Sequence, residues 1–182
     1  MAYRELYGDA MWDDLVIPAT LVNPVGSPSP PTIDENDGTL LFKNGVDNTT
    51  ALIFQLPHSW RVGTDVSFHI HWAKTTSASG TVNWQMKYKW GNIGDVMGAY
   101  SILYGGIESI PNSDTAEKQA LMSFPTATGL MSRTGKTLSS ILNVWLQRTG
   151  TSGDTYGADA RLISADLHIQ KDGNGSRQML IK

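Results

Sequence analysis

The 182-residue sequence contains no cysteine. This absence excludes disulfide bonds and thiolate metal sites, so the fold should not depend on the redox state of its surroundings. Basic runs are missing as well, because no Lys/Arg run is longer than two residues and the net charge is −3. We therefore expect no basic face and no nucleic-acid partner.

Long hydrophobic runs are also absent. No stretch approaches the roughly 18 apolar residues that a membrane span needs, so we expect no membrane partner. The opening residues, MAYRELYGDAMWDDL, lack the basic-then-apolar pattern of a signal peptide, which predicts synthesis in the cytoplasm without secretion. The sequence also has no G-x-S-x-G elbow and no Walker or Rossmann glycine pattern. We assign no catalytic residue and do not expect an enzyme.

The sequence does contain 18 Gly, 8 Pro, 6 Trp and 6 Tyr, distributed over short apolar segments separated by turn residues. This composition is typical of an all-β protein. We predict about eight strands in a two-sheet, jelly-roll-like sandwich. The predicted strands are residues 39–43, 50–56, 65–74, 81–90, 100–104, 119–124, 138–148 and 160–170, with 113–122 as an alternative short helix.

Two regions are expected. Residues 1–38 should form an extended N-terminal arm and a linker, since residues 23–38 carry four Pro and end in an acidic turn. Residues 39–182 should form the sandwich domain. The arm holds more apolar surface than a free tail needs, and we expect it to dock on a neighbouring subunit through Tyr3, Tyr7, Met11 and Trp12.

The segment DVSFHIHWAK (65–74) alternates like a strand and places His69 and His71 on its polar side. The segment 81–90 has the same two-sidedness, so we predict a hairpin between the two. Its register would set His69 opposite Gln85 and His71 opposite Asn83. This predicts a polar stripe formed by the four residues, suited to a contact with another subunit.

The histidine pair also permits a metal site, because side chains at i and i+2 of a strand lie roughly 6.5–7 Å apart on one face. His168, on the same side of its strand as Asp166, could supply a third ligand, if strand order brings it near. The spacing Gly63, then His69-x-His71, matches the start of the cupin metal motif, but Thr75 or Thr76 stands where a glutamate is expected. A cupin-like metal enzyme, a divalent ion on a trimer axis and a metal-free polar strand all remain open.

Exposed aromatic side chains can stack on sugars, which raises a carbohydrate-binding alternative. Trp60 lies in the turn PHSWRVG, and Trp145 is out of phase with its apolar neighbours. Both are candidates for glycan stacking. The alternative interpretation of each tryptophan is partial burial at the rim of the core.

Three stretches together resemble a group of tailed-bacteriophage proteins: residues 56–90 around H-x-H-W and G-x-V-x-W-x-x-x-Y, the segment QALMSFP, and the closing D-x-H-x-Q-x-D-x-x-G-S-R-Q. The resemblance covers about residues 50–180. The matching positions are His69, His71, Trp72, Gly80, Val82, Trp84, Tyr88, Asp166, His168, Gln170, Asp172, Gly175, Ser176, Arg177 and Gln178.

This resemblance implies a structural protein of the virion. We expect a capsid decoration or cement protein, or a head-fibre, neck or tail component, that forms a homotrimer and contacts the major capsid protein. A carbohydrate-binding module for host attachment and a cupin-like metal-dependent enzyme are the alternatives. No cofactor is expected beyond a divalent metal at His69 and His71.

Overall fold

The computed structural model of the chain describes residues 11–24, 29–110, 115–124 and 131–172. Over these ranges the chain forms ten strands and one short 3-10 helix. They are β1 (Met11–Pro18), η1 (Ala19–Leu21), β2 (Thr32–Ile33), β3 (Leu40–Phe42), β4 (Asp47–Gln55), β5 (Ser67–Lys74), β6 (Gly80–Gly91), β7 (Ser101–Ile110), β8 (Gln119–Phe124), β9 (Ile141–Thr149) and β10 (Ala160–Lys171).

All eight predicted strands overlap strands of the structure. The alternative helix over 113–122 is wrong where the structure describes it, because Gln119–Phe124 is strand β8. No helical segment in the described ranges has the length and hydrophobicity that crossing a membrane requires.

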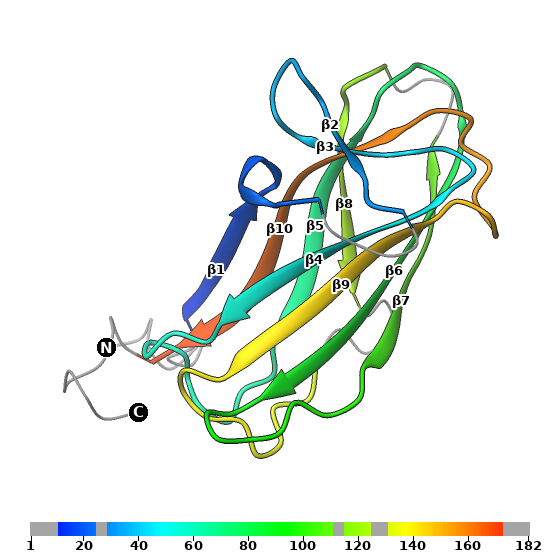
Figure 1. Cartoon of the computed structure of the whole chain (residues 1–182). Helices are drawn as coiled ribbons and strands as arrows, with labels where there is room; N and C mark the ends of the chain where they lie inside the picture. The colour runs from blue at the N-terminus through cyan, green and yellow to red at the C-terminus, as the bar shows by residue number, and fades with distance from the viewer. Residues whose placement is uncertain (1–10, 25–28, 111–114, 125–130, 173–182) are drawn as a thin grey trace.

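The strands form two antiparallel sheets stacked face to face (Figure 1). One sheet has the order β2-β3-β10-β5-β8, with β1 also paired to β10, and the other has the order β4-β9-β6-β7. Without β1 and β2, each sheet has four strands that alternate in the order of a jelly roll. The predicted all-β, jelly-roll-like sandwich is therefore confirmed.

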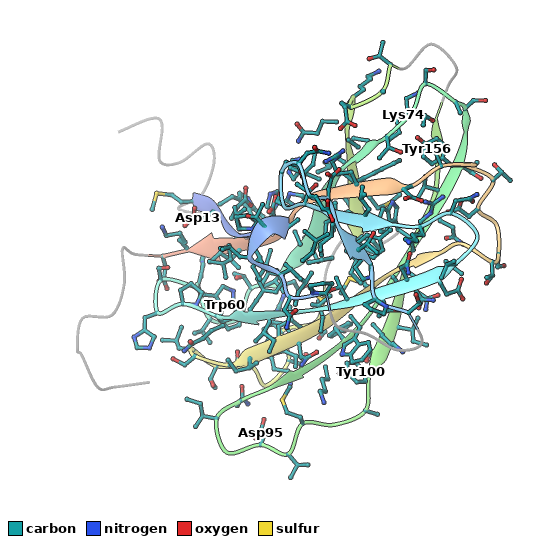
Figure 2. All side chains as sticks on the ribbon, turned by 45° about the horizontal axis from the view of Figure 1, so that its top comes forward. Asp13, Trp60, Lys74, Asp95, Tyr100 and Tyr156 are labelled. Carbon is teal, nitrogen blue, oxygen red and sulfur yellow. The ribbon has the colours of Figure 1, made fainter. Side chains whose placement is uncertain are left out.

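The core lies between the two sheets and is formed by side chains that face inward from both of them. In β9, for example, Leu142, Val144 and Leu146 are inaccessible to solvent. Aromatic rings join the layers, with Trp84 of one sheet against Phe42 and Trp72 of the other at centroid distances of 5.1 and 5.9 Å. Figure 2 shows side chains filling this space. Burial of this apolar surface is the main stabilising contribution to the fold.

The predicted hairpin between residues 65–74 and 81–90 is wrong. Strand β5 pairs with β10 and β8, whereas β6 pairs with β7 and β9 in the other sheet. Both strands do bury the faces that the alternation indicates, but they meet across the core through Trp72 and Trp84. Alternation fixes which face of a strand is buried, and two strands on opposite sides of a sandwich satisfy it as well as two neighbours do.

Strand β1 comes from the segment predicted to be an arm. It pairs along its whole length with β10, from Met11 opposite Lys171 to Pro18 opposite Ser164. Leu15 and Ile17 pack against the core from this edge position. Residues 11–18 thus complete the six-stranded sheet, while Tyr3 and Tyr7 lie outside the described residues.

Arg148 anchors one end of the sandwich. Its guanidinium group is buried and forms a two-point salt bridge with Asp154, at 2.8 and 2.9 Å. It also donates hydrogen bonds to the carbonyl oxygens of Phe42, Ala158 and Tyr156. These five bonds use all five N–H groups of the side chain.

Candidate functional site

Five polar side chains from distant parts of the sequence meet on the outer face of the six-stranded sheet. Strand β10 lies between β1 and β5, so its outward residues face those of both neighbours. Asp166 is directly opposite His69 of β5, and His168 is directly opposite Asp14 of β1. His71 follows on the same side of β5. The strand order therefore brings the two histidine-containing segments together.

Asp166 is the centre of this group. Its Oδ2 lies 3.1 Å from Nε2 of His69 and 3.0 Å from Nε2 of His71. Its other oxygen, Oδ1, is buried and has no hydrogen-bond partner in the described part of the chain. His69 is only 5% exposed and Asp166 only 4%, whereas His71 is half-buried. We refer to His69, His71 and Asp166 as the His-Asp cluster.

The His-Asp cluster could hold a metal ion, because its three ligand atoms lie within 4.8 Å of one another. His168, the predicted third ligand, occupies a different position. Its ring packs edge-on against His69 with centroids 4.4 Å apart, and its Nε2 lies 2.6 Å from Oδ1 of Asp14. Asp166 thus stands where His168 was expected.

Burial lowers the pKa of His69 below its ordinary value of 6.5, and a positive charge on His168 or His71 would lower it further. The carboxylates of Asp166 and Asp14 act in the opposite direction but do not outweigh these effects. Near neutral pH the His69 imidazole is therefore uncharged. A neutral ring is the form that binds a metal or accepts a hydrogen bond.

The two threonines at the cupin glutamate position have other roles. Thr75 donates a hydrogen bond from Oγ1 to the carbonyl of Asp159, and the Thr76 amide donates to the Tyr156 hydroxyl. These bonds hold the end of β5 to the segment that precedes β10. Neither threonine belongs to the group of residues that could hold a metal.

Exposed apolar side chains surround the His-Asp cluster on the same face. Trp12 and Val16 of β1 lie opposite Gln170 and Asp166, and Leu121 of β8 lies opposite His71. Trp12 is 53% exposed and Leu121 is 52% exposed. The outer face of this sheet thus combines a buried polar centre with apolar side chains open to solvent.

Asn83 and Gln85, predicted to share a stripe with the histidines, belong to β6 in the other sheet. Asn83 donates a side-chain hydrogen bond to the carbonyl of Ser152, and Gln85 pairs with Gln147 of β9. The predicted four-residue stripe is therefore wrong. Its two halves lie on opposite outer faces because their strands are in different sheets.

The outer face of the four-stranded sheet carries an aromatic pair, Trp145 and Tyr100, with centroids 6.1 Å apart. Lys87 lies over the Trp145 ring at 5.5 Å, and Lys89 over the Tyr100 ring at 4.9 Å. Trp145 is half-buried and Tyr100 is exposed. Of the two tryptophans considered for glycan stacking, Trp145 thus has an accessible ring.

Trp60, the other candidate, is 1% exposed and packs against Trp90 with centroids 5.8 Å apart. Its turn folds over one end of the sandwich, at the opposite end from Tyr156 (Figure 2). The interpretation of Trp60 as a glycan-stacking residue is therefore wrong. Its ring completes the core and offers no face to a ligand.

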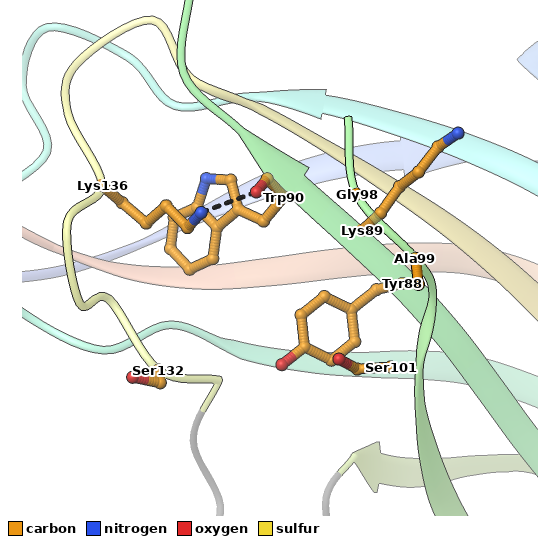
Figure 3. Close-up of a pocket in the computed structure, with 8 residues that line it drawn as sticks. All are labelled: Tyr88, Lys89, Trp90, Gly98, Ala99, Ser101, Ser132 and Lys136. Atoms are coloured by element: carbon orange, nitrogen blue, oxygen red, sulfur yellow. Dashed lines mark hydrogen bonds between the residues drawn. The ribbon is translucent and has the colours of Figure 1, made fainter. Parts of the chain in front are cut away.

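A pocket of about 200 Å³ is lined by residues of β6, by the segment that leads into β7 and by the segment that precedes β9 (Figure 3). Lys136 reaches across its wall and donates a hydrogen bond of 2.6 Å to the carbonyl of Trp90. Lys89 lines the pocket and also contacts Tyr100, which connects the two features. The lining residues are Tyr88, Lys89, Trp90, Gly98, Ala99, Ser101, Ser132 and Lys136. The pocket is smaller than a site for a drug-sized ligand.

No family model matches the sequence, and no curated protein matches it significantly. Among solved structures, it is similar to the insecticidal delta-endotoxin Cry8Ea1 from Bacillus thuringiensis, with a TM-score of 0.43 and 13% identity over 84% of this chain and 23% of that one. It is also similar to the CBM22-1-GH10 modules of the Clostridium thermocellum xylanase Xyn10B, crystallised with xylohexaose, with a TM-score of 0.34 and 8% identity over 92% and 27% of the two chains.

A third similar structure is a carbohydrate-binding module specific for non-crystalline cellulose, CBM28, with a TM-score of 0.30 and 9% identity over 78% of each chain. The present chain spans 23% and 27% of the first two proteins, about a quarter of each. Similarities at this level carry no argument about function.

Proposed function

We propose that the protein is a structural component of a tailed-phage virion, in the role of a capsid decoration or cement protein. The observation that carries this proposal is that one strand from each of the three resembling stretches lies in the same sheet, although the G-x-V-x-W-x-x-x-Y strand β6 belongs to the other sheet. The H-x-H-W strand β5, the QALMSF strand β8 and the D-x-H-x-Q strand β10 are adjacent, in the order β10-β5-β8. Four positions of the resemblance, His69, His71, Asp166 and His168, thus share one outer face.

The character of that face supports binding to another protein. Trp12, Val16 and Leu121 are exposed near the His-Asp cluster. Aromatic side chains such as Trp are enriched in interfaces relative to the rest of a protein surface. We propose that this face contacts neighbouring virion subunits, either the major capsid protein or further copies of the chain in a homotrimer. The place of action is then the virion.

Intact particles provide the test. The purified chain is added to phage particles that lack it, and its occupancy is measured by quantitative mass spectrometry after sedimentation. Wild-type chain should bind to saturation, and the double variant Trp12→Ser, Leu121→Ser should bind at least about tenfold more weakly, the loss of 1.4 kcal/mol of binding free energy or more. Ile53→Ser is the matched control, since Ile53 is exposed on the other sheet.

Two results would reject the proposal. One is absence of the chain from mature particles and from all added-back samples. The other is equal weakening by Ile53→Ser and by the double variant, which would show that the outer face of the six-stranded sheet has no special role. Gold labelling of bound chain in electron micrographs then distinguishes capsid, neck, fibre and tail positions.

A second candidate function, carbohydrate binding for host attachment, has its own observation. Trp145 and Tyr100 form an aromatic pair on the outer face of the four-stranded sheet, and Lys89 connects this pair to the pocket. Aromatic rings with polar neighbours suit sugar stacking. If this surface binds glycans, Trp145→Ala should abolish retention on a host-polysaccharide column while Trp12→Ala leaves it unchanged. Equal retention of wild type and Trp145→Ala would exclude this function.

A further inference from the structure

We propose that His69, His71 and Asp166 bind one divalent transition-metal ion of the zinc class, and that Gln119 positions the His71 ring for it. The site would join β5 to β10 on the outer face of the sheet. This inference does not depend on the proposed virion role, because it concerns the isolated chain.

The first support is the placement of the donor atoms. In a tetrahedral zinc site, with ligand bonds of 2.0–2.2 Å, neighbouring donor atoms are about 3.3 Å apart. Oδ2 of Asp166 lies 3.1 Å from the His69 nitrogen and 3.0 Å from the His71 nitrogen. All three atoms lie within 4.8 Å of one another. Two of the three separations are thus already close to those of a zinc site.

The second support is the electrostatic state of Asp166. In the described ranges His69 and His71 lie beside its carboxylate, and no lysine or arginine pairs with it. Its Oδ1 is buried without a partner. A buried polar atom left unpaired is destabilising, and a buried carboxylate left unpaired is more so. A bound divalent cation would compensate this negative charge directly.

The third support is the environment of His71. Metal binding through Nε2 requires the proton on Nδ1, and such ligands usually give that proton to an oxygen that fixes the ring. The side-chain amide of Gln119, on β8, lies within hydrogen-bond distance of Nδ1 of His71. The amide oxygen and nitrogen are interchangeable by a flip, so Gln119 can accept this hydrogen bond. It therefore acts as a positioning residue.

The donor set defines the class of ion. Two imidazole nitrogens and one carboxylate oxygen suit zinc, cobalt and nickel, whereas calcium and magnesium prefer oxygen ligands alone. The sequence has no cysteine and four histidines. Of the two other histidines, His168 pairs with Asp14, and His58 lies 3.0 Å from the hydroxyl of Ser139 on another part of the surface.

The test uses the full-length chain without an affinity tag, freed of metal by a chelator and titrated with zinc chloride by calorimetry. We expect one zinc ion per chain. His71→Ala and Asp166→Asn should each weaken binding by at least about 100-fold, and Gln119→Ala by about 10-fold to 100-fold. His58→Gln, the matched control, should leave affinity unchanged. Zinc at 100 times Kd should raise the Tm of wild type by about 5–10 °C.

The proposal is overturned if wild type shows no saturable zinc binding, or if His71→Ala and Asp166→Asn bind as tightly as wild type does. Circular dichroism shows whether each variant is folded. If a variant is unfolded, NMR of the histidine ring nitrogens in the wild-type chain provides the test instead. A zinc-dependent shift at Nε2 of His69 and His71 supports the site, and a shift at His58 alone overturns it.

Discussion

Replacing Arg148 with methionine should destabilise the protein more than any exposed ion-pair change. The substitution keeps the volume of an unbranched side chain but removes five hydrogen bonds at once. Asp154, whose side chain is fully buried, would lose its two-point partner. Three backbone carbonyls would lose a donor, those of Phe42, Ala158 and Tyr156.

The expected magnitude follows from the buried charge. Removing one partner of a buried ion pair costs about 3–5 kcal/mol, because the other charge stays buried without compensation. For a chain of this length each kcal/mol corresponds to about 2–4 °C, so the Tm should fall by about 6–20 °C. Asp154→Asn added to Arg148→Met removes the stranded charge and should restore part of the loss.

Urea unfolding followed by tryptophan fluorescence measures these free energies. Arg133→Met is the control, since Arg133 pairs with Asp65 at 3.3 Å in a partly exposed position, where such pairs contribute about 0–1 kcal/mol. The reasoning is refuted if Arg148→Met costs less than about 1 kcal/mol of unfolding free energy, or no more than Arg133→Met.

Two further changes test the fold. Gly80 has a φ of +150°, and a Cβ added to it would lie 2.7 Å from the Cα of Tyr156. Gly80→Ala should therefore lower the unfolding free energy by more than about 1 kcal/mol. The control Gly157→Ala, with open space around the added Cβ, should be near neutral, and equal effects of the two variants in urea unfolding would contradict this reasoning. The pKa of Asp37 is lowered below 3.8, mainly by hydrogen bonds from Thr39 and also by Arg161. The stabilisation of the folded state by ionised Asp37 is therefore present above pH 3.8 and is lost as the pH falls through its folded-state pKa. Asp37→Asn should reduce the loss of stability below pH 3.8, and an unchanged pH profile would count against the assignment.

The sequence predicts the strands well because alternation and turn residues are local signals. Phe68, Ile70 and Trp72 are buried as their spacing indicates. Pairing is not a local signal. The partner of His69 is Asp166, almost a hundred residues further along the chain, and nothing in the intervening sequence encodes that contact. The predicted hairpin failed for this reason, although the buried face of each strand was predicted correctly.

The candidate site was predictable in part. The H-x-H spacing marks His69 and His71, and alternation puts Asp166 and His168 on one side of their strand. Choosing between Asp166 and His168 as the third ligand requires the register of β10 against β5. Gln119 gave no sequence signal, because a glutamine at the start of a strand is ordinary until its neighbour is known. Trp60 was misassigned because a turn position does not reveal that the turn folds back over the core.

The pairing of β1 with β10 makes one edge of the sheet depend on a separate piece of chain. Along that edge of β10, β3 covers Ala160–Leu162 and β1 covers Ser164–Lys171. Removal of the first 18 residues, by truncation or by a protease, would leave eight positions of backbone open to any extended strand. A shortened product would then self-associate through this edge of β10, which β1 covers in the intact chain. The size of its aggregates would therefore say nothing about the oligomeric state of the intact chain.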